Sequence, residues 1–518
     1  MRSLYGSLLL LGICKLATAQ VNYSEHIAPI IYNHCTKCHR DGEIGPMPLT
    51  NYSEVSANGS MIAYVTDIKY MPPWRPDNTY THFIGENVLT DEEIDLIGSW
   101  VSNGMPQGNP DLEPDPPVFP TGSQVGVPDL IITMDEPYQH QGNNVDQYQI
   151  FVLPTSLTED KDVSAIEVRA DNKSICHHAI LGLDTTGTAQ ELDADDTEYG
   201  YTEFGGFGFD PVDPFFSAWV PGATPLVYPP TLGKKLYAGS DLLLQMHYGP
   251  SATPQTDQTS VNIFYADDPI QRYIITYPVS LQDLDVPFLI PPNEVKSFHG
   301  TVDVPFGVSL IGIAPHAHLL GKSYEVYAVS ANQQDTINLI KIPEWNFNWQ
   351  GLYAYPNPKH IPAGYTVHCI GTFDNTTNNP LNPNDPPQYV WWGESTSDEM
   401  YLCYLQFVFY QNGDENISLA VEDSNTNLIY PVHQLFPSYP NPTNNTFTIG
   451  YSLGSPDKVD LVLYDSNGRL VKQILSGANR PPGRFKETIS VDDLAPGIYI
   501  YQLRTKGFEQ SAKLIISE

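Results

Sequence analysis

The chain has 518 residues, which is too long for one domain, because domains usually span about 100–200 residues. It has 60 acidic and 25 basic residues, for a formal net charge of −35. This charge argues against nucleic acids and anionic membrane surfaces as partners, since both recruit Lys and Arg. Charged residues make up only 16% of the chain, which excludes a disordered acidic tail and a coiled coil. The 46 Pro, 38 Gly and 32 Tyr favour β-rich domains with many turns.

Residues 1–19 are predicted to form a secretory signal peptide. Arg2 supplies a positive charge, Leu8–Leu11 an apolar run, and Ala17-Thr18-Ala19 an A-x-A cleavage site. Cys14 leaves lipidation as an alternative, although the residue before it is not small. No later stretch is long and apolar enough for a membrane span. We therefore expect an exported chain in which disulfides are allowed.

Residues 20–106 contain a motif for covalent haem attachment. Cys35-Thr36-Lys37-Cys38-His39 is a C-x-x-C-H run, in which both thiols add to the haem and the His ligates its iron. A zinc site would need two further ligands, and none stands at a suitable spacing nearby. Residues 25–31 are expected to form a helix that enters the motif. Thr90 and Glu93 indicate a capping box at the start of a later helix.

The second axial ligand of the haem iron is expected to be a Met or a His between these helices. The candidates are Met47, Met61, Met71 and His82. In Tyr70-Met71-Pro72-Pro73-Trp74, the prolines favour an extended loop that presents a thioether. The region resembles small class I cytochromes c, and this resemblance implies Met71 as the ligand. The alternative for each of these Met residues is core packing.

A linker rich in Pro and acidic residues follows at 107–124, and after it come short β-type runs with three histidine clusters. The clusters are Cys176-His177-His178, Gln245-Met246-His247-Tyr248-Gly249 and His316-Ala317-His318. On a strand, His316 and His318 point to the same face and form a natural metal chelate. His177 and His178 point to opposite faces of a regular strand, so they share a metal only at a bulge or a strand end.

Together these motifs resemble the copper type II, ascorbate-dependent monooxygenases, the family of peptidylglycine α-hydroxylating monooxygenase and dopamine β-monooxygenase. The matching runs are Cys176-His177-His178-Ala179, Gln245-Met246-His247-Tyr248-Gly249, His316-Ala317-His318-Leu319-Leu320-Gly321 and Asp398-Glu399-Met400, with Cys403 shortly after and residues 343–350 as a further similar segment. Their order and approximate spacing match the family over most of the chain's middle region.

The resemblance implies two β-sandwich domains, 125–275 and 276–425, with one copper ion each. His177, His178 and His247 would form the electron-supplying site. His316, His318 and Met400 would form the site where O2 and substrate meet. Imidazole suits both oxidation states of copper, and a thioether favours Cu(I). For Met400 taken alone, the alternative is a core methionine.

Some positions depart from the family. Ala314 stands where the peptide-amidating members have an Arg for the substrate carboxylate, so a glycine-extended peptide is not the expected substrate. Cys369 and Cys403 resemble one family pair and are expected to form a disulfide. Cys176 remains, either as a buried free thiol or as a further sulfur near the metal.

Residues 435–518 resemble the type A sorting domain of type IX secretion. The matching runs are Phe436–Pro442, Leu463–Arg469, Leu494–Tyr499 and Lys513–Ile516. The residues alone predict a small β-sandwich without a catalytic constellation, and the alternative is a generic adhesion module. The resemblance implies export through the periplasm by the type IX machinery, to the medium or the cell surface.

We therefore expect a multidomain, mainly β protein with a small α-helical cytochrome c-like domain, two jelly-roll-like copper β-sandwiches and a small β-sandwich sorting domain. Its expected function is hydroxylation of a C–H bond in a small organic or peptide-like substrate with O2, using two copper ions and one haem c. A reductant such as ascorbate or a redox protein supplies electrons, relayed by the haem. The alternatives are a non-catalytic haem and copper redox or copper-binding surface protein, and a cytochrome whose β-domains only bind a partner or glycan.

Overall fold

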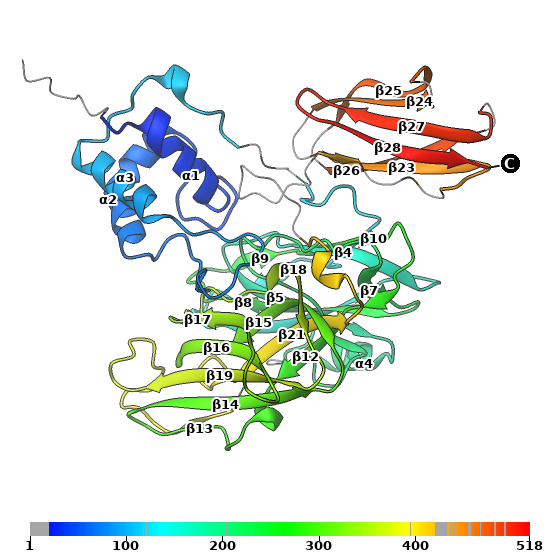
Figure 1. The fold of residues 1–518 in the computed structure, drawn as a ribbon. Helices are drawn as coiled ribbons and strands as arrows, with labels where there is room; N and C mark the ends of the chain where they lie inside the picture. Colours follow the sequence, from blue (N-terminus) through cyan, green and yellow to red (C-terminus); the bar gives the residue numbers. More distant parts are fainter. Residues whose placement is uncertain are drawn as a thin grey trace, which may run out of the picture. The chain divides into compact units, whose positions relative to one another are not determined.

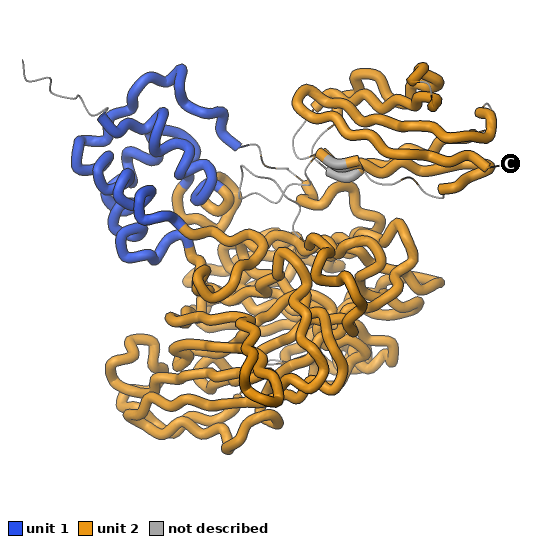
Figure 2. Tube along the Cα trace, in the orientation of Figure 1, with its two compact units in different colours: residues 1–36, 48–72, 89–117 blue, residues 37–47, 73–88, 118–518 orange. Residues whose placement is uncertain are grey.

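The protein is multidomain and mainly β, with a small helical N-terminal region and several β-sandwich sheets, as predicted (Figure 1). The structure is a computed structural model that describes residues 20–117, 119, 122–203, 206–393, 395–419, 433–435, 438, 441–453, 457–466, 468–480, 483–491 and 494–517. The predicted signal peptide lies outside the described residues. Figure 2 shows two compact units: residues 1–36, 48–72 and 89–117 form the first, and residues 37–47, 73–88 and 118–518 form the second.

The first unit is helical. Its elements are a π-helix (Tyr23–Ile27), α1 (Ala28–His34), α2 (Tyr52–Asp67), α3 (Asp91–Ser102) and a short 3-10 helix (Pro110–Leu112). The predicted capping box is present, because Thr90 Oγ1 accepts the Glu93 N–H at 3.2 Å and the Glu93 carboxylate accepts the Thr90 N–H at 2.8 Å. The fully buried rings of Trp100 and Tyr23 lie 6.1 Å apart and pack α3 against the first helical turn.

The first β-sandwich of the second unit lies between residues 130 and 273. Its strands are β1 (Leu130–Thr133), β2 (Tyr138–His140), β3 (Gln147–Pro154), β4 (Lys161–Arg169), β5 (Cys176–Asp184), β6 (Asp213–Trp219), β7 (Leu232–Leu236), β8 (Asp241–Tyr248), β9 (Gln255–Asp257), β10 (Ser260–Tyr265) and β11 (Arg272–Tyr273), with α4 (Thr188–Asp195) after β5. One sheet has the order β1-β10-β4-β7-β11 and the other β3-β8-β5-β6, while β2 pairs with β9. Strand β8 is buried along its whole length, because it is an inner strand whose apolar side chains face the core.

A second β-sandwich follows directly. Its strands are β12 (Ile275–Val279), β13 (Leu289–Ile290), β14 (Glu294–Val304), β15 (Val308–His316), β16 (Gly321–Ser330), β17 (Thr336–Ile342), β18 (Tyr353–Ile361), β19 (Tyr365–Asn375), β20 (Val390–Trp391) and β21 (Leu402–Phe409). The facing sheets have the orders β12-β21-β15-β18 and β14-β19-β16-β17, and β13 pairs with β20. Side chains from both sheets form one core, which includes Leu310, Val326, Tyr355 and Val367.

Residues 73–88, which fall in the predicted cytochrome range, pack on this second sandwich. The Ile84 N–H donates to the Ala354 carbonyl at 2.8 Å. The buried Phe83 ring lies 5.1 Å from the ring of Tyr355 and joins the sandwich core. The chain after α2 is therefore anchored on β18.

Asp414 links the two sandwiches. Its buried carboxylate accepts two hydrogen bonds from Arg272 of β11, at 2.7 and 2.8 Å, and one from Ser309 of β15 at 2.6 Å. Burial favours a higher pKa for Asp414, but the hydrogen bonds from Arg272 and Ser309 outweigh it and lower the pKa to about 2.

We expect Asp414→Asn to lower the free energy of unfolding by about 3–5 kcal/mol, because the largely buried Arg272 loses its counter-charge. The folded-state pKa lies below the unfolded value of about 3.9, so the carboxylate's contribution is complete above about pH 4 and is lost as the pH falls towards 2. Urea unfolding of both proteins at pH 7 and pH 3 measures this. The control Asp160→Asn breaks a more exposed ion pair with Lys235, which solvent screens, and should leave the free energy of unfolding almost unchanged. An equal, small loss in both variants would contradict the prediction.

A third β-sandwich lies near the C-terminus. Its strands are β22 (Gln434–Leu435), β23 (Thr446–Leu453), β24 (Asp457–Asp465), β25 (Leu470–Arg480), β26 (Gly483–Ser490), β27 (Gly497–Arg504) and β28 (Glu509–Ile516). Its sheets have the orders β22-β23-β26 and β25-β24-β27-β28 and share a core. Several residues of the predicted sorting motifs, among them Phe436, Pro437, Tyr439 and Pro440, lie outside the described residues.

Candidate metal centres

Three histidines meet at one end of the four-stranded sheet of the first sandwich. His178 of β5 pairs with His247 of the adjacent strand β8. The register shifts between Cys176 and His178, so the chain around His177 is not a regular strand. One ring nitrogen from each histidine lies within 4.8 Å of the others. The irregular strand end that the His177-His178 pair requires is therefore present.

The free ring nitrogens of this group suit a metal ion. Among the described residues, His177 Nε2 and His247 Nδ1 are buried without a hydrogen-bond partner. His247 Nε2 lies 2.7 Å from the Asp146 carboxylate, which holds the ring and leaves Nδ1 free to bind. A carboxylate commonly holds the far nitrogen of a metal-binding histidine. Three imidazoles are a donor set that suits copper, so these residues fit the metal that the resemblance implies.

His177 and His178 are neutral near pH 7. Burial, together with the nearby His247, lowers the pKa of His177 to about 4. Burial, followed by His247 and His177, lowers the pKa of His178 well below its usual value. Because a metal binds the neutral ring, these histidines do not have to lose a proton first.

We expect Asp146→Asn to weaken copper binding at this group about 10–100-fold, since the amide holds the His247 ring less firmly than a carboxylate does. Copper titration against a competing chelator at pH 7 measures the change. The matched control is Asp285→Asn, because Asp285 lies 3.2 Å from His299 Nδ1 and so forms the same kind of pair outside the group. Equal affinities in Asp146→Asn and the wild type would refute the role of Asp146.

Asp257, which is wholly buried on β9, supports the same sheet end. Its carboxylate accepts hydrogen bonds from Tyr248 Oη at 2.9 Å and Thr259 Oγ1 at 2.8 Å, and Tyr248 directly follows His247. Cys176 is a buried free thiol, and burial followed by the charge of Asp257 raises its pKa. The Asp257 carboxylate therefore interacts with Tyr248 and Cys176, which are the neighbours of His247 and His177 in sequence. Cys176 is buried and free, as one of the two predictions for it stated.

His316, His318 and Met400 come from neighbouring segments of the second sandwich. His316 ends β15 and pairs with Leu402 of β21, and the buried Met400 lies two residues before Leu402. The rings of His316 and His318 are 5.2 Å apart and perpendicular. His318 Nδ1 lies 3.2 Å from the Asp398 carbonyl oxygen, and an N–H···O bond there leaves Nε2 free for a metal.

Glu399 holds these segments together. Its wholly buried carboxylate accepts backbone N–H groups from Leu320 at 2.9 Å, from Met400 at 2.8 Å, and from His318. One side chain therefore fixes the backbone on both sides of the group. Burial raises the pKa of Glu399 to about 8, although the backbone N–H groups act in the opposite direction.

The second group is also neutral near pH 7. Burial and then the neighbouring His318 lower the pKa of His316 to about 3. Burial lowers the pKa of His318 to about 4, against hydrogen bonding to Asp398. Two imidazoles and a soft thioether suit copper, with a preference for Cu(I).

Phe347 contacts both histidine groups. Its ring lies 5.2 Å from the ring of His177, which it stacks on, and 6.0 Å from the ring of His318. The two groups also affect each other electrostatically, because His177 and His247 contribute to the lowered pKa of His316. The groups therefore belong to one neighbourhood of the molecule.

The haem motif lies where the chain passes from the first unit to the second. Cys35 belongs to the first unit, and Cys38 and His39 to the second. His39 Nδ1 lies 3.1 Å from the Met47 carbonyl oxygen, which leaves Nε2 for iron. A Cβ atom on Gly45 would stand 2.8 Å from His39 Nδ1, so glycine permits this close turn. These residues fit a covalently bound haem.

The candidates for the second axial ligand lie in different parts of the chain. Met71 follows α2 in the first unit. Met61 is 56% exposed on α2, which does not suit an iron ligand in a haem pocket. His82 belongs to the second unit and lies 3.0 Å from Glu86. Met71 stays a prediction from the sequence.

The predicted disulfide between Cys369 and Cys403 is not present, and this prediction is wrong. Both residues are buried free thiols in the core of the second sandwich. Burial and then a hydrogen bond between the two thiols raise the pKa of Cys403 well above its usual value. Because the thiolate is the reactive form, such a pair is slow to oxidise.

The sequence did not identify the supporting residues of the two groups. Glu399 and Phe347 stand in runs that the family resemblance singled out, although neither was assigned a role. Asp146 carries no such signal, because the pairing of β3 with β8 brings it to His247. Asp257, nine residues after its partner Tyr248, carries none either.

Comparison with known proteins identifies the C-terminal segment. Residues 438–517 match a family described as a secretion system C-terminal sorting domain, which confirms the predicted type IX sorting domain. The protein is therefore secreted or located at the cell surface. No helix in the described part of the chain is long and apolar enough to cross a membrane. No relative was found among curated proteins.

Solved structures show only remote likeness. A β-glucuronidase of Parabacteroides merdae is 13% identical over 46% of this chain and 29% of its own, with a TM-score of 0.14. A β-glucuronidase of Faecalibacterium prausnitzii is 11% identical over 44% of this chain and 38% of its own, with a TM-score of 0.13. The adhesin domain of Epf from Streptococcus pyogenes is 8% identical over 50% of this chain and 79% of its own, with a TM-score of 0.14. The chain thus spans well under half of each glucuronidase, and likeness this low carries no argument about function.

Proposed function

We propose that the protein is an exported copper monooxygenase that hydroxylates a C–H bond of an organic substrate with O2. The observation that carries this proposal is the presence of two different donor sets, one of three imidazoles and one of two imidazoles with a nearby buried thioether, both of which have a ring in contact with Phe347. Copper, when bound, supplies one-electron redox chemistry and O2 activation, and a two-electron hydroxylation needs two such centres or a second reductant.

The residues divide into two roles. His177, His178 and His247 would hold the copper that stores and passes electrons, and Asp146 orients the His247 ring. His316, His318 and Met400 hold the copper at which substrate is hydroxylated, and Glu399 fixes their backbone. The lowered pKa values keep four of the five histidines neutral and able to bind a metal at the pH of the medium, namely His177, His178, His316 and His318.

The haem adds an electron store on the same chain. Cys35, Cys38 and His39 hold it, with Met71 as the proposed second axial ligand. With haem and copper bound, a low-molecular-mass reductant such as ascorbate, or a redox protein, would supply the electrons. Ala314 is 8% exposed and offers no positive charge for a substrate carboxylate, which favours a neutral organic or peptide-like substrate.

Product labelling tests the proposal. The purified, copper-loaded protein is supplied with reductant, ¹⁸O2 and a panel of organic and peptide-like compounds, and the products are examined by mass spectrometry. We expect one ¹⁸O atom in a hydroxylated product, and loss of that product when copper is removed. Reductant and O2 consumption that depends on copper, without any labelled product across the panel, would instead indicate a redox protein without hydroxylase activity.

A further inference from the structure

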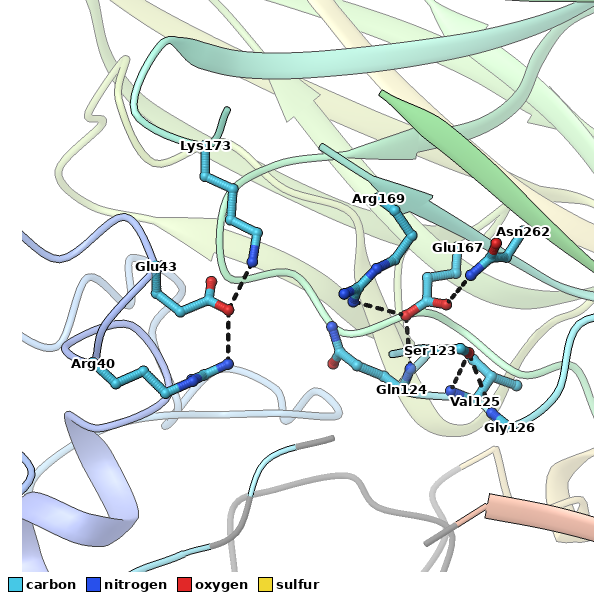
Figure 3. Close-up of polar contacts among 10 residues, drawn as sticks. All are labelled: Arg40, Glu43, Ser123, Gln124, Val125, Gly126, Glu167, Arg169, Lys173 and Asn262. Atoms are coloured by element: carbon cyan, nitrogen blue, oxygen red, sulfur yellow. Dashed lines mark hydrogen bonds and ion pairs between the residues drawn. The ribbon is translucent and has the colours of Figure 1, made fainter. Parts of the chain in front are cut away.

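The segment that follows the first haem cysteine is attached to the first sandwich by a charge cluster. Figure 3 shows the Glu43 carboxylate between two cations. Glu43 lies 2.8 Å from Arg40 of its own segment and 2.7 Å from Lys173, in the loop between β4 and β5. The three side chains are only 18–22% exposed, so solvent screens them less than a typical surface pair.

A second contact lies close by in sequence. Lys37 Nζ donates to Thr224 Oγ1 at 2.6 Å. A Cβ atom on Gly222 would stand 3.1 Å from Cys38 Sγ, so the loop after β6 approaches the haem cysteine closely. Segment 37–47 therefore contacts two separate loops of the first sandwich.

Both loops lead to the histidine end of the same sheet. Lys173 stands four residues before His177. The other loop follows β6, whose last residue, Trp219, pairs with Ala179, the residue after His178. The haem-binding segment therefore contacts the two loops that adjoin the sheet end with the three histidines.

We propose that these contacts dock the haem-binding segment so that the group of His177, His178 and His247 is the acceptor of electrons from the haem. This inference rests on the proposed function and adds which copper is reduced first. Each transfer oxidises one ferrous haem to ferric and reduces one cupric ion to cuprous, so the electrons balance without a further reactant. Glu43, Lys173 and Lys37 act as positioning residues.

The competing route leads to the second sandwich. Residues 73–88, which follow Met71, also pack on that sandwich, and Trp74 lies 5.6 Å from the Tyr353 ring. Tyr353 pairs with Ile313 of β15, the strand that ends at His316. If the haem delivers its electron along this segment, loss of the three-histidine copper leaves haem oxidation intact.

Rapid mixing separates the routes. The haem of the intact chain is reduced without oxygen, cupric ions are loaded, and the haem absorption is followed as it reoxidises. We expect reoxidation in the wild type and in His318→Ala, and none in His247→Ala. Reoxidation in His247→Ala at the wild-type rate would overturn the inference. No reoxidation in the wild type would refute the relay in the proposed function itself.

Docking is tested with the same signal. We expect Lys173→Glu to slow reoxidation about tenfold, as a loss of about 1.4 kcal/mol in docking predicts. The matched control Lys322→Glu breaks the Lys322–Asp374 pair on the second sandwich and should keep the wild-type rate. Thr224→Val, which removes the partner of Lys37, is a second variant in case Lys173→Glu does not fold. Wild-type rates in a folded variant at either position would overturn the docking role.

Discussion

Replacement of Met400 by Leu is expected to stop product formation while the copper at His177, His178 and His247 stays bound. Met400 is 5% exposed, and Leu fills a similar volume, so the free energy of unfolding should fall by less than about 1.5 kcal/mol. The change removes the thioether, the soft donor that favours Cu(I). We expect hydroxylation to fall at least about 100-fold, because interactions at a catalytic metal contribute several kcal/mol.

Metal analysis and product assays of the same preparation check this. The matched control is Met134→Leu, a buried methionine in the core of the first sandwich, which should keep both copper ions and full activity. Loss of both coppers in Met400→Leu would show that the two sites are not independent. Full activity in Met400→Leu would show that Met400 is a core methionine.

Glu399→Gln is expected to lower the stability of the second sandwich and to weaken copper binding beside it. Glu399 accepts backbone N–H groups of His318, Leu320 and Met400 in a fully buried position. An amide group turns N–H donors towards these N–H groups and leaves at least one without an acceptor, at a cost of about 1–3 kcal/mol each. We expect the free energy of unfolding to fall by about 2–5 kcal/mol and copper binding at the second group to weaken about 10–100-fold.

Chemical unfolding and copper titration measure the two effects separately. Glu325→Gln, which breaks a half-exposed pair with Lys341, is the control and should change stability by less than about 1 kcal/mol. Copper binding at the three-histidine group should be unchanged in Glu399→Gln. A variant as stable as the wild type, with unchanged copper binding, would contradict the role of Glu399.

Local patterns in the sequence were enough to predict many elements. One of the short β-type runs, residues 241–248, is the strand β8, and Thr90 with Glu93 predicts the helix start that α3 shows. The sorting domain is also recognisable from short runs, because its turns and strands are local features. In each case the residues that specify the element lie within it.

Features that depend on distant segments were not predictable in this way. Asp146 meets His247 because β3 pairs with β8, and nothing near Asp146 in sequence marks that contact. The sequence predicts residues 37–47 and 73–88 as parts of a cytochrome domain. In the structure, residues 37–47 pack on the first sandwich through Lys173, and residues 73–88 pack on the second sandwich through β18. The free thiols of Cys369 and Cys403 also depend on distant segments, because the two residues lie on different strands, β19 and β21.

The central claim is that one chain holds a haem and two copper sites of different donor sets. Quantification of copper, haem iron and protein in the same purified preparation tests it most directly. We expect two copper ions and one haem per chain in the wild type, and one copper ion with one haem in Met400→Leu. A preparation that binds haem but no copper after loading would contradict the account.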